Sequence, residues 1–128
     1  IELQGTKIAI FAVGPMLSMA LQVAKKVKDE LETDITVINP RFLTGLDEEL
    51  LNLLKENHDF IITLEDGELM GGYGQTIASF YGTSKMLVKN HGISKAFHTD
   101  FNPEKLLEEN GMSVNKLFNE ISSFLTNK

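Results

Sequence analysis

The stretch FIITLEDGELMGGYGQTIASF, Phe60–Phe80, carries the clearest structural signal in the chain. It opens with the apolar, strand-type segment Phe60–Leu64, which ends in the acids Glu65 and Asp66. A glycine cluster follows, made of Gly71, Gly72 and Gly74. A strand that ends in carboxylates and leads into a glycine-opened helix is how α/β proteins build sites at the carboxyl ends of their strands. The stretch therefore predicts an α/β fold with a site at this junction.

The segments before this stretch also alternate between strand and helix patterns. Lys7–Val13 is almost continuously apolar, which is typical of a strand buried on both faces of a parallel sheet. Gly14 and Pro15 then open a helix. Apolar residues at helical spacing predict its buried stripe: Leu17, Ala20, Leu21, Ala24, Val27 and Leu31. Ile35–Ile38 is a second, β-branched strand, and the acids Asp47–Glu49 favour the first turn of another helix.

Beyond the glycine cluster, the pattern predicts a helix from about Gly72 to Lys89 that stops at Asn90–Gly92. Ile93–His98 alternates and is expected to be the fourth strand. A short helix should begin at Asn102-Pro103, and Ser113 should cap the last helix. Strands that alternate with crossover helices predict a mainly parallel sheet covered on both faces. Ile1–Leu3 is expected to add an edge strand.

Composition narrows the class of protein. A chain of 128 residues predicts one domain, and its net charge of −6 argues against nucleic-acid binding, which depends on Lys and Arg. The absence of cysteine excludes disulfides, thiolate metal sites and a cysteine nucleophile, and it fits a cytoplasmic location. No apolar run approaches the ~20 residues that span a membrane. Because the chain begins with Ile, we expect a fragment of a longer polypeptide.

The glycine cluster allows two interpretations. Gly72–Ile77 resembles a dinucleotide-binding fingerprint, but Ile77 stands where the third small residue belongs, and a long loop separates Leu64 from Gly71. The glycines then serve either close packing of a helix end on the sheet or contact with an anion. Both interpretations stay open from the residues alone.

Polar residues after the other strands are further candidates for a site. Arg41, the only arginine, follows the second strand, where its guanidinium could bind a carboxylate or phosphate or form a salt bridge at an interface. Glu65 lies nearest the end of the third strand, and His98 with Asp100 is expected at the end of the fourth. His58 and His91 are expected near helix ends, where a cation is favoured. No histidine spacing indicates a zinc site, and no catalytic constellation is visible.

Three segments resemble the C-terminal domain of transketolase-like enzymes: Lys7–Met16, Ile38–Asp47 and Leu64–Gly74. The resemblance is greatest to the branch that makes 1-deoxy-D-xylulose 5-phosphate. It implies a three-layer α/β/α domain with a five-stranded sheet, of which four strands are parallel and one is antiparallel. It also implies a dimeric parent enzyme, dependent on thiamine diphosphate and magnesium, which condenses pyruvate with glyceraldehyde 3-phosphate for isoprenoid and thiamine synthesis.

In that family the cofactor and metal are held by an N-terminal domain, and the activating glutamate comes from a middle domain. The resemblance therefore implies that this chain alone is inactive and serves packing between domains or subunits. Its candidates for interface or anion contacts are Arg41, Glu65, Gly71, Gly72, Gly74, His98 and Asp100, and none of them is catalytic. The alternatives are the corresponding domain of a transketolase or of a 2-oxoacid dehydrogenase β subunit, or a stand-alone α/β module that binds an anion or nucleotide.

Overall fold

Strands and helices alternate along the chain in the computed structural model, which describes residues 3–12, 16–39, 48–66, 73–82, 84–93 and 113–126. The strands are β1 (Lys7–Ala12), β2 (Thr36–Ile38), β3 (His58–Asp66) and β4 (Leu87–Ile93). The helices are α1 (Met16–Leu31), α2 (Glu48–Leu54), α3 (Tyr73–Tyr81) and α5 (Val114–Thr126). The short helix predicted after Asn102 lies outside the described residues.

The strands form one sheet in the order β2-β1-β3-β4, and every neighbouring pair is parallel. An antiparallel bridge joins Leu3 to Val37 on the outer side of β2. The mainly parallel sheet is therefore confirmed, and Leu3 takes the place expected of an antiparallel edge strand. Because β2 and β3 lie on opposite sides of β1, the chain reverses direction across the sheet between β1 and β3.

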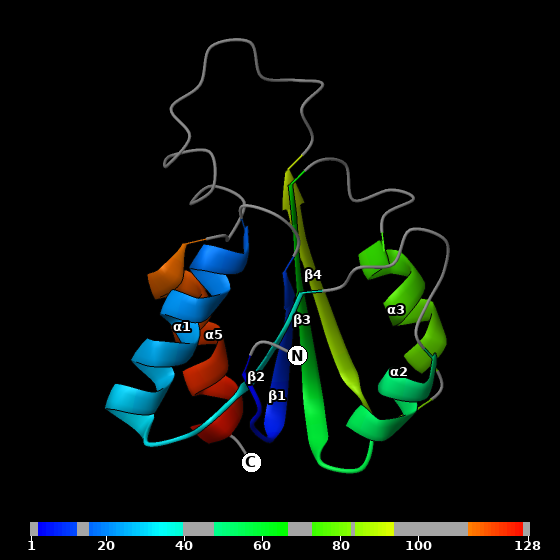
Figure 1. Cartoon of the computed structure of the whole chain (residues 1–128), viewed down its shortest axis with the longest axis horizontal. Helices are drawn as coiled ribbons and strands as arrows, with labels where there is room; N and C mark the ends of the chain where they lie inside the picture. The colour runs from blue at the N-terminus through cyan, green and yellow to red at the C-terminus, as the bar shows by residue number, and fades with distance from the viewer. Residues whose placement is uncertain are drawn as a thin grey trace, which may run out of the picture.

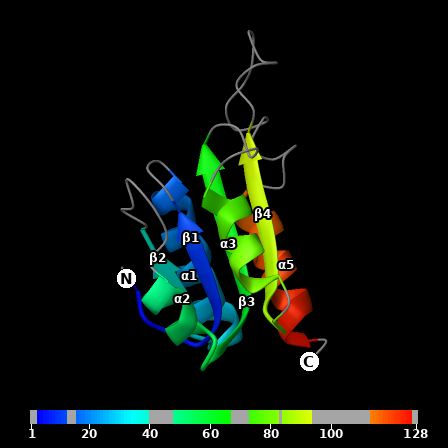
Figure 2. The ribbon, with the colours of Figure 1, turned by 90° about the vertical axis from the view of Figure 1, so that its right-hand side faces the viewer.

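Helices cover both faces of this sheet, as Figures 1 and 2 show. Helices α1 and α5 lie on one face, and α2 and α3 lie on the other. Alternate side chains of β1 enter the two cores: Ile8 and Ile10 pack with α1 and α5, whereas Ala9 and Phe11 pack with α2 and α3. The predicted three-layer α/β/α class is confirmed.

The predicted boundary between the third helix and the fourth strand is wrong. Helix α3 ends at Tyr81, whose buried hydroxyl donates a hydrogen bond of 2.6 Å to the carbonyl oxygen of Leu51 on α2. A turn follows, in which the amide of Ser84 donates to the carbonyl of Tyr81 at 2.8 Å. Leu87–Ile93 then pairs with β3 along its whole length. Pairing with a distant strand overrides the local helical pattern here.

The buried stripe of α1 is also displaced from the prediction. Its buried residues are Met16, Ala20, Val23, Ala24 and Val27. Leu21, which was placed in the stripe, is 36% exposed, whereas Val23 is fully buried. The small alanines at the centre of the true stripe allow the helix backbone to approach the sheet closely, and Leu17 and Leu31 pack at its margin.

The amino-terminal cap of the last helix follows the prediction. The hydroxyl oxygen of Ser113 accepts a hydrogen bond of 3.1 Å from the amide of Lys116. This bond satisfies one of the amides that the first turn of a helix leaves without a partner. The cap fixes where α5 begins, and the helix then buries Leu117 and Ile121 against the sheet.

We predict that Gly5→Ala destabilises the fold because the segment before β1 touches the backbone of residues 34–35. A Cβ atom on Gly5 would overlap the carbonyl group of Asp34 and lie 2.6 Å from the carbonyl carbon of Ile35. Backbone atoms cannot move aside as a flexible side chain can, so we expect a loss of about 2 kcal/mol in the free energy of unfolding, measured by urea denaturation.

Gly82→Ala is the matched control for this substitution. Its Cβ would meet the carbonyl oxygen of Ser79 at 3.3 Å on an exposed turn. We expect a change within about 0.5 kcal/mol. Equal losses at the two glycines would contradict the close packing at Gly5.

Candidate functional site

The carboxyl edge of the sheet is where the opening stretch lies. Strand β3 continues past Leu64, and Glu65 and Asp66 pair with Gly92 and Ile93 of β4. The arrowheads of β3 and β4 point to the same end of the molecule in Figures 1 and 2. Helix α3 begins at Tyr73, so the predicted sequence of strand, loop and helix is confirmed at both ends. In doubly wound sheets, ligand crevices form at this edge, where the strand order reverses.

The predicted site residues are placed only in part. Glu65 lies on the interior strand β3 at the carboxyl edge, where the structure describes its backbone but not its side chain. Gly74 is in the first turn of α3. The other candidates lie outside the described residues: Arg41, Gly71, Gly72, His98 and Asp100. Their roles stay predictions.

A polar cluster that the sequence reasoning missed joins β4 to α5 close to this edge. The ammonium of Lys89 donates to Oε2 of Glu120 at 3.0 Å, and Nε2–H of His91 donates to Oε1 of the same carboxylate at 3.2 Å. The side chains of His91 and Glu120 are only 10% and 19% exposed. His91 is therefore a strand residue paired with a carboxylate, and its predicted place near a helix end is wrong.

The environment of Glu120 favours its charged form. Burial on its own would raise the pKa of this carboxyl group, but the hydrogen bonds from His91 and Lys89, together with their charges, outweigh burial. The pKa of Glu120 is lowered as a result. The cluster is thus an anion held between two donors on alternate residues of β4.

A second contact fixes β4 on its other face. The hydroxyl of Thr63, fully buried on β3, donates a hydrogen bond of 2.6 Å to Oδ1 of Asn90. Successive residues Asn90 and His91 therefore attach β4 to β3 and to α5, because neighbouring side chains of a strand point to opposite faces. Both contacts lie just before Glu65 and Asp66 in the register, so they hold the end of the β3–β4 pair in place.

His58 begins β3 at the opposite, amino edge, and it is 4% exposed. Its Nδ1–H donates to the carbonyl oxygen of Leu54, the last residue of α2, at 3.2 Å. Its Nε2 accepts a hydrogen bond of 2.7 Å from the hydroxyl of Thr36. Burial lowers the pKa of His58 and outweighs the Leu54 hydrogen bond and the nearby charge of Asp59. The histidine does contact a helix end as predicted, but the neutral imidazole is favoured over the expected cation.

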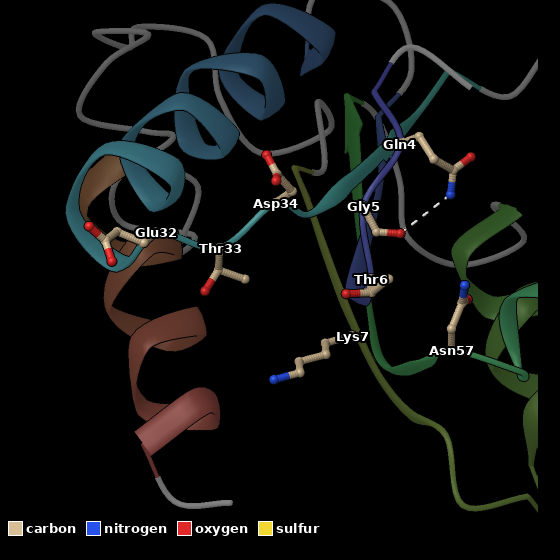
Figure 3. A pocket seen from close by; sticks show the side chains of 8 residues that line it. All are labelled: Gln4, Gly5, Thr6, Lys7, Glu32, Thr33, Asp34 and Asn57. Carbon is tan, nitrogen blue, oxygen red and sulfur yellow. Dashed lines mark hydrogen bonds between the residues drawn. The ribbon is translucent and has the colours of Figure 1, made fainter.

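An open cavity of about 540 Å³ lies at the amino edge, where Asn57, the residue before His58, contributes to its wall (Figure 3). It is lined by the segments Gln4–Lys7 and Glu32–Asp34 and by Asn57. Lys7 and Glu32 have φ angles of 71° and 52°, which lie in the left-handed region. At Lys7 this angle accompanies a tight turn in which the amide of Ile8 donates to the carbonyl of Thr6 at 2.8 Å. The cavity is polar and lies at the end of the sheet away from the predicted site.

The described residues offer no metal site of the usual kind. Within these ranges, no group of three or more His, Cys, Asp or Glu side chains could hold a metal ion. A diphosphate bound through magnesium needs oxygen ligands for the metal and donors for the phosphates. The described side chains at the carboxyl edge do not form such a set, so no step of cofactor chemistry is derived from them. Among the described helices, none is long and apolar enough to cross a membrane.

The fold and its edges define a class: an α/β/α domain with a parallel sheet whose strand order reverses between β1 and β3. The family model for "Transketolase, C-terminal domain" matches residues 1–117. The chain belongs to this family.

Three similar curated relatives are enzymes of one kind. The chain is 30% identical over 129 residues to a 1-deoxy-D-xylulose-5-phosphate synthase of Francisella philomiragia, covering 98% of this chain and 20% of the relative. It is 32% identical over 126 residues to that of Clostridium perfringens, covering 95% and 20%. For the synthase of Vibrio atlanticus the identity is 33% over 123 residues, covering 94% and 19%. The chain thus spans about a fifth of the length of the curated relatives it matches.

A solved structure supports the assignment to the transketolase C-terminal domain family. It is described as a split gene transketolase, inactive beta4 tetramer, and it superposes with a TM-score of 0.79 at 25% sequence identity. The match covers 97% of this chain and 41% of the solved one. The expected relation to transketolase-type enzymes is confirmed by sequence and by fold.

We predict that Glu120→Gln loosens α5 from β4. Glutamine keeps an acceptor oxygen but removes the charge that both Lys89 and His91 contact. We expect a loss of about 1 kcal/mol in the free energy of unfolding at pH 7, measured by urea denaturation. A group with a lowered folded pKa stabilises the fold above its unfolded pKa, and this contribution disappears as the pH falls through the folded value. The difference between wild type and variant should therefore shrink below about pH 4.

Glu30→Gln is the matched control on α1. Its carboxylate lies 3.7 Å from the ammonium of Lys26 and is 55% exposed, so we expect almost no change. A constant difference between wild type and Glu120→Gln down to pH 3 would contradict an ionised Glu120 in the cluster.

Proposed function

We propose that residues 1–128 form the C-terminal domain of a 1-deoxy-D-xylulose-5-phosphate synthase. One observation carries this proposal. Nearly the whole chain aligns, at 30% to 33% identity, with a segment that makes up about a fifth of the length of each of three such synthases. The parent enzyme would condense pyruvate with glyceraldehyde 3-phosphate and release carbon dioxide, at the start of isoprenoid and thiamine synthesis. Its expected location is the cytoplasm.

Thiamine diphosphate and magnesium would be held by other domains of that enzyme. The described residues supply no metal-binding group, and the net charge of −6 disfavours a diphosphate. Thiamine diphosphate, when bound there, supplies the carbanion that accepts the two-carbon unit. The chain's own part is to present a rigid carboxyl edge to a neighbouring domain or to the second subunit of a homodimer.

The residues proposed for this contact follow the strand ends. They are Arg41, Glu65, Gly71, Gly72, Gly74, His98 and Asp100. The contacts of Asn90 and His91 favour this role, because they hold the β3–β4 pair in place up to the level of Glu65. A strand end whose backbone is already held loses less conformational entropy on docking.

We expect the 128-residue chain alone to be inactive. Assembly with the polypeptide that carries the remaining domains, on the same chain or a separate one, should give turnover of pyruvate and glyceraldehyde 3-phosphate. The measurements are carbon dioxide release and chromatographic detection of 1-deoxy-D-xylulose 5-phosphate. Turnover by the isolated chain would overturn the proposal. An assembly that uses a ketose phosphate donor in place of pyruvate would assign the chain to a transketolase instead.

Glu65→Ala tests the proposed contact edge. We expect it to weaken association with the remaining domains about tenfold in Kd, measured by calorimetry on separately expressed parts. The matched control is Glu56→Ala, because Glu56 is an exposed acid in the turn before β3, at the opposite end of the same strand. Equal affinities for both variants would exclude the carboxyl edge of β3 as the contact.

A further inference from the structure

A continuous chain of hydrogen bonds runs through the buried amino edge of the sheet. The amide of Gly5 donates to Oγ1 of Thr36 at 3.0 Å, and the hydroxyl of Thr36 donates to Nε2 of His58 at 2.7 Å. On the other side of the ring, Nδ1–H donates to the carbonyl of Leu54. A carbonyl only accepts and an amide only donates, so the ring carries a proton on Nδ1 and the oxygen of Thr36 accepts from Gly5. In the neutral ring, which burial favours, Nε2 then accepts the hydroxyl hydrogen of Thr36.

This chain of bonds ties together parts of the fold that are distant in sequence. It joins the segment before β1 to β2, β3 and the end of α2. Three further backbone contacts hold the segment: Leu3 pairs with Val37, the amide of Thr6 donates to the carbonyl of Asp34, and the amide of Lys7 donates to the carbonyl of Asn57. Thr36 is fully buried, and within the described residues its hydroxyl is the only side-chain group that contacts the backbone amide of Gly5.

Protonation of His58 would reverse the direction of its hydrogen bond with Thr36. Nε2 would become a donor, so the hydroxyl hydrogen of Thr36 would lose its acceptor at a fully buried position. A cation would also be placed where His58 is 4% exposed. Charged side chains on the surrounding elements are Lys7 on β1, Asp34 before β2, Lys55 and Glu56 after α2, and Asp59 on β3. Of these, Asp59 favours the protonated ring, but burial outweighs it.

We propose that Gly5, Thr36 and His58 form a protonation-sensitive latch that holds the segment Leu3–Thr6 against the sheet. When His58 takes up a proton, the buried hydroxyl hydrogen of Thr36 is left without an acceptor, and the segment opens so that water can reach Thr36 and His58. Because Gln4, Gly5 and Thr6 form one wall of the amino-edge cavity, the shape of that cavity changes with the latch (Figure 3). The inference rests on the geometry of this edge and does not depend on the proposed enzyme function.

The direction of the pH effect follows from proton binding. The latched state holds fewer protons than the open state, since an exposed imidazole titrates near pH 6.5. The latch is therefore fully favoured above about pH 6.5 and weakens as the pH falls through that value toward the lowered pKa of the buried ring. Opening at acid pH is local, because β1 contains no titratable group at its buried positions Ile8–Ala12.

Nuclear magnetic resonance on the 128-residue chain tests this latch. At pH 8, nitrogen chemical shifts of His58 should show the proton on Nδ1. Between pH 8 and pH 5, the protection factor of the Gly5 amide against hydrogen exchange should fall at least tenfold, while that of Ile62 on β3 stays constant. A proton on Nε2 at pH 8, or a parallel fall at Gly5 and Ile62, would overturn the proposal.

Thr36→Val removes the hydroxyl at nearly constant shape. We expect the Gly5 amide to exchange about tenfold faster at pH 8 and its protection factor to become independent of pH. Thr6→Val is the matched control, because Thr6 is exposed and lines the same cavity, and its side chain makes no hydrogen bond to the other described residues. Unchanged pH dependence in Thr36→Val, or its loss in Thr6→Val, would overturn the role of Thr36.

Discussion

The parallel pairing of β1 with β3 is the constraint on which the other elements depend. Ile8–Ala12 and the facing residues Ile61, Ile62 and Leu64 have no exposed surface. Two adjacent strands that are apolar on both faces cannot leave either face to water, so helices must cover both. Parallel neighbours also require long crossover connections, and these connections supply α1, α2 and α3. One sequence property, continuous apolarity in two strands, thus sets both the layers and the order of the elements.

The attachment of β4 shows how side-chain contacts make the carboxyl edge of the sheet rigid. Among the described strands, β4 lies at the end of the sheet order and pairs with β3 alone, and a strand paired on one side is less constrained. Two side-chain contacts from consecutive residues, Asn90 and His91, compensate by fixing it to β3 and to α5. Both contacts lie close to Glu65 in the register, so they restrain the ends of β3 and β4. This arrangement suits a surface that docks on another domain.

Local signals in the sequence predicted the elements that local forces determine. Strand β1, helix α1, the acidic first turn of α2 and the Ser113 cap were all readable, because propensity, capping and periodicity act over a few residues. The end of α3 was not, because Leu87–Ile93 becomes a strand only through its pairing with β3. The polar contacts were equally invisible: Thr36 and His58 are 22 residues apart, and His91 and Glu120 are 29 apart. Of the predicted site residues, Glu65 lies at the end of β3 and Gly74 lies in the first turn of α3.

The two histidines show that burial alone does not decide what an ionisable group does. At the amino edge, His58 meets a carbonyl and a hydroxyl, partners that satisfy a neutral ring, and burial lowers its pKa. At the carboxyl edge, His91 meets the carboxylate of Glu120, whose pKa is lowered by its two donors. As the pH falls, the two edges are therefore expected to respond at different pH values. The contact of His58 begins to weaken near the ordinary pKa of histidine, whereas the cluster of Glu120 persists until carboxylates protonate. The amino edge of the sheet can therefore loosen while the carboxyl edge, which is proposed to dock, remains intact. A neutral histidine holds the first edge, and an ionised carboxylate holds the second.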